Sequence, residues 1–204
     1  MEQSLTILYT GELRGNLESL PYLFTYLKML RQRMISDRTF YVDIGGACDP
    51  SVWHCEVTNG RSMLVALDGM GCAVVNVSGY PTAAVRDQLG DNVALTLVDD
   101  RHPHVSDDLI FLSDQPTSTI EYDRLAIVLA PGDRTRLQDR VIKFTPVTGK
   151  QVGIVNLEFL DGEWMLANYT IRDLPANTPA DPTIAGAVDF IVQEAQQAQK
   201  KRGR

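Results

Sequence analysis

Three turns that each follow an expected strand carry the side chains best suited to chemistry. The turns span residues 10–16, 43–46 and 78–81. The candidate site residues in them are Glu12, Arg14, Asp43, Gly46, Gly79 and Tyr80. Carboxylate oxygens at strand ends are suitable ligands for divalent metals. Arginine cannot be a ligand, because its guanidinium keeps its proton and has no free acceptor. The turns therefore resemble a metal site that has lost ligands.

Arg14 suggests two other roles. With Glu12 and Asp43 nearby, its guanidinium would replace the charge of the missing cations and hold the turns together through paired hydrogen bonds. Alternatively, Arg14 and the backbone N–H groups of the glycine turns would bind an anion such as phosphate without hydrolysing it. Tyr80 would contact such a ligand, although a partly buried tyrosine more often has a partner within the protein.

The loop after the second strand offers a separate set of zinc-ligand types. They are Asp43, Cys48, Asp49, His54 and Cys55. Their spacing completes no known zinc pattern, so we expect them to pack within the loop. We expect the pair His102 and His104 to lie in a surface loop. Nucleophilic catalysis by a cysteine is disfavoured, because the only base near Cys48 and Cys55 is the adjacent His54.

Length and charge exclude several classes of protein. A chain of 204 residues with 44% hydrophobic content predicts one globular domain over 1–204. The net charge of -7 argues against a nucleic-acid partner, because phosphate backbones require a clustered positive surface. The only basic run, 200–204, lies at the C-terminus, and we expect 196–204 to be a disordered tail.

The cysteine count and the hydropathy bear on the compartment. Three cysteines without a regular framework favour a reducing environment over a protein held together by disulfides. The N-terminus lacks the pattern of a signal peptide. No stretch approaches the roughly 18 apolar residues that span a membrane. The sequence therefore predicts a cytoplasmic protein with no membrane partner.

The first half of the chain alternates between strand and helix patterns. The expected strands are 5–10, 39–44, 73–77 and 93–98, and the expected helices begin at Pro21, Asn59 and Thr82. The region 45–58 is expected to be a loop. Such alternation predicts an α/β fold with a largely parallel sheet covered by helices. Loops at the carboxyl ends of those strands are where ligands usually bind.

The second half is rich in short strands. The expected strands there are 109–112, 118–122, 125–129 and 141–145, which we interpret as a β-meander. Asp161-Gly162 between two alternating runs, 152–159 and 164–171, predicts a hairpin. Asp181-Pro182 then predicts the start of a helix. The expected buried face of this helix is Ile184, Val188, Ile191 and Ala195.

The sequence also resembles a known family. The segments that carry the resemblance are LTILYTGELRGNLE from Leu5, PYLFTYLKMLRQR, FYVDIGG, GMGCAVVNVSG and the closing stretch from Gly149. They are similar to the amino-terminal domain of bacterial 5'-nucleotidases and 2',3'-cyclic phosphodiesterases, within the calcineurin-like metallophosphoesterases. The resemblance covers about 5–100 and 147–195. It implies a layered α/β sandwich with a mixed sheet, flanking helices, a β-rich second half and a C-terminal helix.

The family hydrolyses phosphoesters with two metal ions bridged by a carboxylate. Its Asp-x-His turn corresponds here to Glu12-x-Arg14, its bridging aspartate to Gly46, and its Gly-Asn-His-Glu turn to 78–81. The comparison implies a non-catalytic protein without metal, acting as a binding or interaction module for phosphate or a nucleotide. The alternative is an active phosphoesterase with a rearranged or mononuclear manganese or zinc site. That site would use Glu12, Asp43, His54 or the histidine pair.

Overall fold

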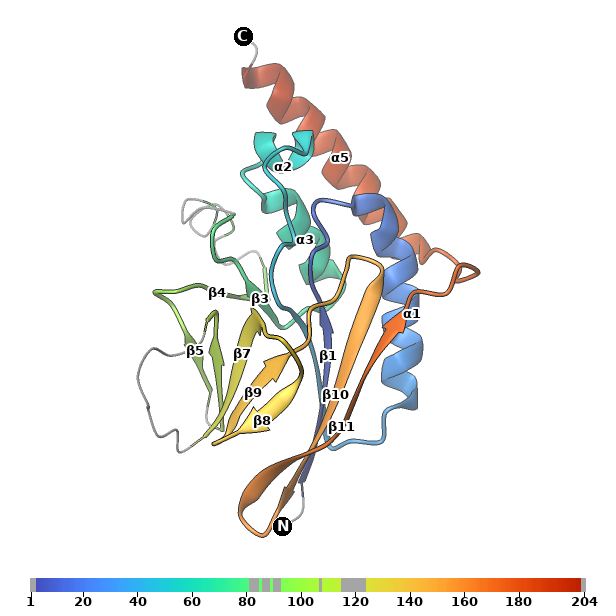
Figure 1. Cartoon of the computed structure of the whole chain (residues 1–204). Coiled ribbons are helices and arrows are strands. Elements are labelled where there is room, and N and C mark those ends of the chain that lie inside the picture. Colours follow the sequence, from blue (N-terminus) through green and yellow to red (C-terminus); the bar gives the residue numbers. More distant parts are fainter. Residues whose placement is uncertain are drawn as a thin grey trace.

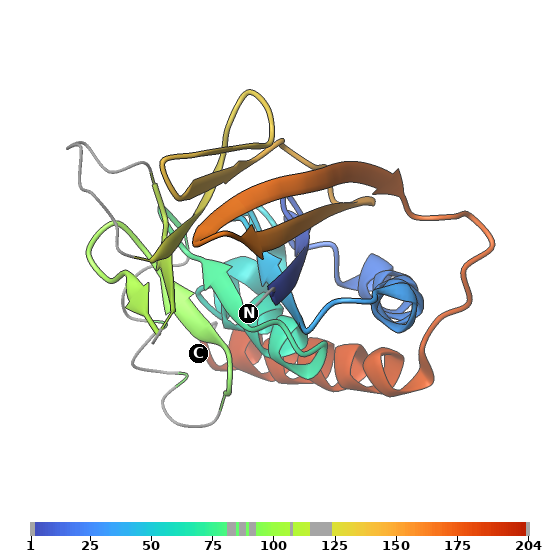
Figure 2. The same cartoon turned by 90° about the horizontal axis from the view of Figure 1, so that it is seen from below.

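The computed structural model describes residues 3–80, 85, 89, 93–106, 108–114 and 124–202. Its strands form two sheets that face each other, and the helices gather on the outer face of the larger sheet (Figure 1). Seen from below, the three layers follow one another as smaller sheet, larger sheet and helices (Figure 2). The expected layered α/β sandwich is therefore confirmed.

The larger sheet has the strand order β11-β10-β1-β2-β3-β4. Its strands are β1 (Gln3–Thr10), β2 (Arg38–Asp43), β3 (Val74–Asn76), β4 (Thr96–Val98), β10 (Gln151–Leu160) and β11 (Glu163–Asp173). β1 to β4 are parallel, as the alternating pattern predicts. β10 runs antiparallel to β1, and β11 runs antiparallel to β10. The expected hairpin at Asp161-Gly162 is therefore present.

The smaller sheet has the strand order β5-β6-β7-β9-β8. Its strands are β5 (His104–Val105), β6 (Leu109–Leu112), β7 (Leu125–Pro131), β8 (Arg136–Gln138) and β9 (Val141–Phe144). The β-meander prediction is wrong, because β6, β7 and β9 are parallel. Parallel neighbours require crossover connections, and such connections need not be helical. The expected strand 118–122 lies outside the described residues.

The helices cover one face of the larger sheet. They are η1 (Leu17–Ser19), α1 (Leu20–Arg33), α2 (Trp53–Val57), α3 (Arg61–Gly69) and α5 (Pro182–Arg202). α2 interrupts the region expected to be a loop. Most of the expected helix 82–89 lies outside the described residues, although Val85 and Leu89 are helical and buried. None of the described helices combines the length and apolar character needed to cross a bilayer.

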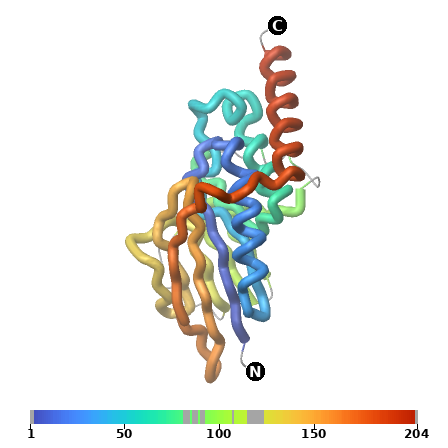
Figure 3. Tube along the Cα trace, turned by 90° about the vertical axis from the view of Figure 1, so that its right-hand side faces the viewer, coloured from blue at the N-terminus to red at the C-terminus, as the bar shows by residue number. Residues whose placement is uncertain are grey.

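The C-terminal helix forms as its sequence predicts but continues further. The Asp181 carboxylate accepts hydrogen bonds from the amides of Thr183 and Ile184, at 2.9 and 3.2 Å, which caps α5. All four residues of its expected apolar face are buried. The helix continues to Arg202, beyond the ends of the other helices (Figure 3). The prediction of a disordered tail is therefore wrong for 196–202.

Two apolar clusters lie on opposite faces of the larger sheet. Along β1, Leu8 belongs to the cluster under the helices, whereas Ile7 and Tyr9 belong to the cluster between the two sheets. Successive residues alternate between the faces of a strand, so both faces are covered. Burial of each such side chain contributes about 1.5–3 kcal/mol to folding. This packing holds the strand ends, and with them the turns, in fixed positions.

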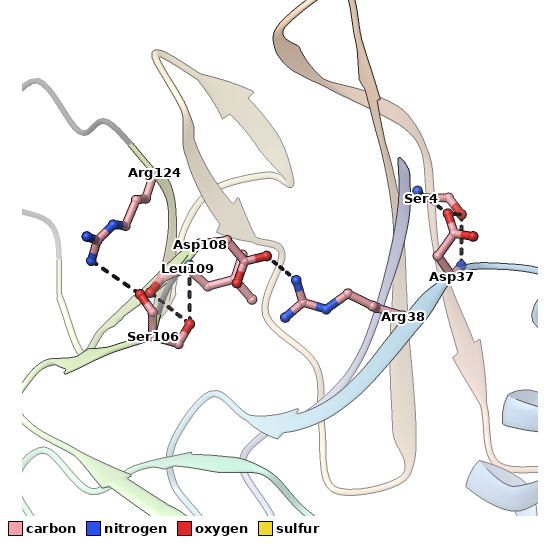
Figure 4. Close-up of polar contacts among 7 residues, drawn as sticks. All are labelled: Ser4, Asp37, Arg38, Ser106, Asp108, Leu109 and Arg124. Carbon is pink, nitrogen blue, oxygen red and sulfur yellow. Dashed lines mark hydrogen bonds and ion pairs between the residues drawn. The ribbon is translucent and has the colours of Figure 1, made fainter. Parts of the chain in front are cut away.

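Polar contacts join the sheets near the amino ends of their strands (Figure 4). Arg38 on β2 forms an ion pair with Asp108, which precedes β6 in the smaller sheet. Asp37 accepts hydrogen bonds from the amide and hydroxyl of Ser4, at 2.7 and 2.8 Å, so it fixes the start of β1. Arg124 donates to the carbonyl of Ser106 at 3.2 Å. These contacts lie at the other end of the strands from the three turns.

Candidate functional site

The first two turns lie side by side at the carboxyl ends of β1 and β2. Their backbones form a ladder in which the amides of Glu12, Arg14 and Gly15 donate to carbonyls. The acceptors are the carbonyls of Gly45, Gly46 and Ala47, and all three distances are 2.8 Å. These amides are therefore already engaged within the protein. The ladder holds the two turns together, and the hydrogen bond from the Thr10 hydroxyl to the Asp43 carboxylate adds to it.

The first turn holds two non-glycine residues in the left-handed backbone region. Glu12 has φ 52° and Arg14 has φ 49°. For a residue with a Cβ this conformation costs about 1–2 kcal/mol. Such outliers persist where the surroundings enforce them, and they occur often at functional sites. Here the backbone ladder enforces them, so the path of the turn is fixed by backbone hydrogen bonds.

Arg14 pairs with Glu12 inside the first turn. Its Nε and Nη2 atoms both lie 2.8 Å from the same oxygen, Oε2 of Glu12. Among the described side chains, Glu12 is the only hydrogen-bond partner of this guanidinium. The predicted pairing with Glu12 is confirmed, but the pair does not reach across to Asp43. The Arg14 side chain is 69% exposed, so the pair lies at the surface.

Asp43 is fully buried at the end of β2. Its Oδ2 accepts a hydrogen bond from the Thr10 hydroxyl at 2.7 Å, and its Oδ1 accepts one from the Gly45 amide at 3.0 Å. Burial raises the pKa of Asp43 to about 7, and the nearby Glu12 carboxylate adds to the rise, against those two hydrogen bonds. Both oxygens of the Asp43 carboxylate therefore already have hydrogen-bond partners within the protein.

Gly46 occupies the expected position of the bridging aspartate, and a side chain there would require the Glu12 side chain to move. A Cβ on Gly46 would lie 2.5 Å from Oε1 and 3.1 Å from Cα of Glu12. Its φ of 70° also disfavours every residue except glycine. The backbone conformation and the present position of the Glu12 side chain thus both favour glycine here.

Asn76 is a site residue that the sequence analysis did not identify. It ends β3, is buried, and its Nδ2 contacts the carbonyls of Ile44, Ser113 and Leu129 at 3.1–3.4 Å. Its Oδ1 accepts a hydrogen bond from the Ser78 amide at 2.9 Å. The side chain thereby joins the second and third turns to the ends of two strands of the smaller sheet. In the sequence, the pattern that could have indicated this role was an asparagine directly after two valines of an expected strand.

Tyr80 and Gly79 have different surroundings in the third turn. The Tyr80 hydroxyl donates to the carbonyl of Cys55 at 2.7 Å, which ties this turn to α2. Tyr80 is half-buried and therefore has the partner within the protein that the sequence analysis considered commoner. Gly79 is exposed with φ 86°, and a Cβ there would meet nothing within 4 Å. Its glycine is required by backbone conformation alone.

The loop after β2 contains a disulfide between Cys48 and Cys55. The odd number of cysteines favours a reducing environment, and one pair nevertheless forms a disulfide; Cys72 is free and buried. The disulfide lies against the first turn, because a Cβ on Gly15 would lie 3.0 Å from Sγ of Cys55. A disulfide provides neither zinc ligands nor a thiolate nucleophile. The two cysteines therefore fix the loop against the first turn.

The histidines also have partners within the protein. His54 is buried, and its Nδ1 and Nε2 lie 2.9 and 2.8 Å from the Ser62 hydroxyl and the Gly15 carbonyl. Burial lowers the pKa of His54, although the Gly15 carbonyl opposes the change, so the ring is neutral at pH 7. His102 contacts Asp99 at 2.7 Å, and His104 packs against Phe111.

These residues do not fit a binuclear metal centre. Gly46 provides no bridging carboxylate, and the Glu12 side chain occupies the space beside it. Both Asp43 oxygens and both His54 nitrogens already have hydrogen-bond partners. Over the described ranges, no three His, Cys, Asp or Glu side chains are grouped so that they could hold an ion. The described residues thus differ from the metal site implied by the resemblance in geometry as well as in chemistry.

An open hollow adjoins the first turn. Its volume is about 570 Å³, and Asn16 and Tyr22 form one wall while Lys150 and Leu174 form another. Gly149 brings the second wall close to the first turn, because a Cβ there would lie 2.9 Å from the Glu12 carbonyl. The side chain of Tyr22 is 43% exposed. The surface near the first turn is therefore hollowed and partly aromatic.

Comparison with known proteins identifies the fold. No protein-family profile matches the chain, and no curated protein matches it in sequence. Its structure is similar to the crystal structure of the calcineurin-like phosphoesterase YfkN from Bacillus subtilis, with a TM-score of 0.66 and 11% sequence identity. The alignment covers 98% of this chain and 100% of that chain. The chain has a calcineurin-like phosphoesterase fold.

At 11% identity, the likeness to YfkN concerns the fold alone. It agrees with the layered architecture implied by the sequence resemblance. In this calcineurin-like phosphoesterase fold, the three turns lie at or beyond the carboxyl ends of adjacent parallel strands, where α/β proteins usually bind ligands. The chemistry of the site must therefore be argued from its own residues.

Proposed function

We propose that this protein is a non-catalytic member of the calcineurin-like phosphoesterase fold and acts as a binding or interaction module. The observation that supports this most directly is the contact between Gly46 and Glu12. A bridging carboxylate at residue 46 would overlap the Glu12 side chain. Without a bridge, two cations cannot be held close enough to clamp a phosphoryl group and activate water.

The electrostatics of the turns support the same proposal. Arg14 places a permanent positive charge beside Glu12, so it neutralises a carboxylate that would otherwise attract a cation. The environment of Asp43 favours its protonated form up to about neutral pH. We further propose descent from the bacterial 5'-nucleotidase and 2',3'-cyclic phosphodiesterase group, on the basis of the motifs around the three turns.

The surroundings of Arg14 favour a protein partner over phosphate or a nucleotide. An anion would have to displace Glu12 from the guanidinium, and the amides of the first turn already donate to the second. The side chains of Tyr22 and Trp53 are 43% and 37% exposed, and both belong to segments beside this turn. Arginine, tyrosine and tryptophan are the residue types that contribute most to protein interfaces.

Metal content and hydrolysis test the absence of catalysis. The purified protein is loaded with manganese or zinc, and its metal content and its turnover of bis-p-nitrophenyl phosphate and of a nucleotide are measured. We expect no stoichiometric metal and no turnover above the buffer. Asp43→Ala and the matched variant Asp49→Ala serve as controls. Stoichiometric metal together with turnover that Asp43→Ala alone abolishes would overturn the proposal and establish the rearranged-site alternative.

Thermal unfolding with phosphate and nucleotides tests the ligand. An interaction module for a protein predicts no stabilisation by these anions. Stabilisation that disappears in Arg14→Ala would instead assign phosphate or a nucleotide to the first turn, because a ligand that binds only the folded state raises the unfolding temperature. Arg101→Ala, which changes an exposed arginine in the loop between β4 and β5, controls for a general effect of charge.

A further inference from the structure

Two hollows adjoin at the end of the molecule opposite to the three turns. Each has a volume of about 460 Å³, and Arg140 and Trp164 line both of them. The turn between β8 and β9 forms one side, and the β10–β11 hairpin forms the other. Both turns lie toward the lower end in Figure 1. Volumes of this size are typical of sites for small molecules.

Arg140 has an unfavourable backbone conformation. It and Asp139 form the two-residue turn between β8 and β9, with φ of 61° and 50°. Turns with two such residues prefer glycine in the second position, as in Asn-Gly or Asp-Gly. The β10–β11 hairpin has that arrangement, because Asp161 has φ 52° and Gly162 has φ 89°. The chain thus contains two similar turns, and only one of them places arginine where glycine fits best.

The two hollows are lined by aromatic and cationic residues together with the acidic residues Asp108, Asp139 and Glu163. Trp164 packs against Phe159 with ring centroids 5.3 Å apart and is only half-buried. Arg124 precedes β7, the parallel neighbour of β9, and lines one of the hollows. Figure 4 shows Arg124 reaching the carbonyl of Ser106, and Asp108, which lines the same hollow, is paired with Arg38 from the larger sheet. Both Arg124 and Arg140 also interact with other residues of the chain.

We propose that the two hollows form a binding site for a small molecule with a planar aromatic ring and one phosphate or carboxylate group. The ring packs on Trp164, and the anionic group accepts hydrogen bonds from Arg140 and Arg124. The forked guanidinium matches the geometry of both anions. Glycine at residue 140 would relieve the backbone but remove this donor. The site is separate from the three turns and goes beyond the proposed function.

Tryptophan fluorescence tests the site. In a Trp53→Phe background, Trp164 is the sole tryptophan. The probes are adenosine monophosphate and indole-3-acetate, which distinguish phosphate from carboxylate, with adenosine and inorganic phosphate as controls. We expect saturable quenching by at least one of the two probes and by neither control. If neither probe quenches Trp164 saturably at millimolar concentration, the proposal is wrong.

The Arg140→Gly variant separates a ligand-binding role from a structural one. We expect this variant to unfold about 2–4 °C higher than the parent, because the strain is relieved. We expect its affinity for the probe to fall about tenfold or more, because hydrogen bonds to charged groups are lost. A lower unfolding temperature would show that Arg140 stabilises the fold, and would overturn the proposal.

Two variants provide matched controls. A Cβ on Gly162 would meet nothing within 4 Å, so Gly162→Ala measures the cost of the left-handed backbone alone, and it should lower the unfolding temperature. Arg14→Ala, at the other end of the molecule, should leave probe binding unchanged. If Arg14→Ala weakens binding as much as Arg140→Gly does, the probe occupies the three turns and the proposed site is wrong.

Discussion

Replacing Asp43 by asparagine should stabilise the protein above pH 7 and have little effect below pH 4. In the folded protein the pKa of Asp43 is about 7, against an ordinary value of 3.8. The folded state therefore binds the proton more tightly than the unfolded state does. The stability that comes from this tighter proton binding at Asp43 is fully present below pH 3.8. It is lost as the pH rises through 7.

The size of the effect follows from the two pKa values. Each pKa unit corresponds to about 1.4 kcal/mol, so ionisation of Asp43 costs about 4 kcal/mol of unfolding free energy above pH 7. Asparagine keeps the shape without the charge. Its Oδ1 can accept from the Gly45 amide, and its Nδ2 can donate to the Thr10 hydroxyl, which then donates to the Tyr41 hydroxyl 3.1 Å away.

Urea unfolding at several pH values measures the difference between Asp43→Asn and the parent protein. The difference in unfolding free energy between the two proteins contains no contribution from groups that titrate alike in both. Between pH 5 and pH 8, the stabilisation by the variant should grow by about 3 kcal/mol. Asp49→Asn is the matched control: hydrogen bonds from Ser51 lower the pKa of Asp49, so its effect should be constant over this range.

The reasoning fails if the difference for Asp43→Asn is constant between pH 5 and pH 8. A variant less stable than the parent at pH 8 would be more informative still. It would mean that the Asp43 carboxylate is ionised and satisfied, as it would be beside a bound cation, and would favour the rearranged metal site over the non-catalytic proposal.

Three further predictions concern the turns and the C-terminal helix. Gly46→Asp should lower the unfolding free energy by at least about 1–2 kcal/mol, because the residue is left-handed and meets Glu12; stabilisation by manganese in this variant would contradict the reasoning. Breaking the Cys48–Cys55 disulfide, with a sequence separation of 7, should cost about 2–3 kcal/mol in urea unfolding. The control for this prediction is Cys72→Ser, measured with and without reductant. If the parent protein is equally stable with and without reductant, the disulfide does not form. Gly186→Ala should raise stability by about 0.5–1 kcal/mol, because a Cβ there meets nothing within 4 Å inside α5; a loss in urea unfolding would mean that this helix face is covered.

Features determined by neighbouring residues were predictable from the sequence. The Asp161-Gly162 hairpin and the cap at Asp181 depend on local backbone chemistry, and both form where expected. The pairing of Arg14 with Glu12 is also local, since the two residues are separated by one. In each case the residues that determine the structure lie within one short window of sequence.

Features determined by distant partners were not predictable. Asn76 contacts carbonyls that lie 32, 37 and 53 residues away, so nothing near it indicated its role. The odd number of cysteines hid the pairing of Cys48 with Cys55, because the spare thiol Cys72 is buried elsewhere. The parallel order of β6, β7 and β9 depends on crossover connections, whose direction short strand patterns do not reveal.

Because Glu12 lies against Gly46, the order of mutations matters for building a metal site in these turns. Aspartate at residue 46 is obstructed while Glu12 keeps its length, whereas a shorter Glu12 side chain leaves Arg14 without its partner. Neither single change alone therefore provides a bridging carboxylate in an unobstructed position. Under the proposed loss of the metal site, gaining that site again is harder than losing it, so the fold persists as a scaffold on which new binding surfaces can form.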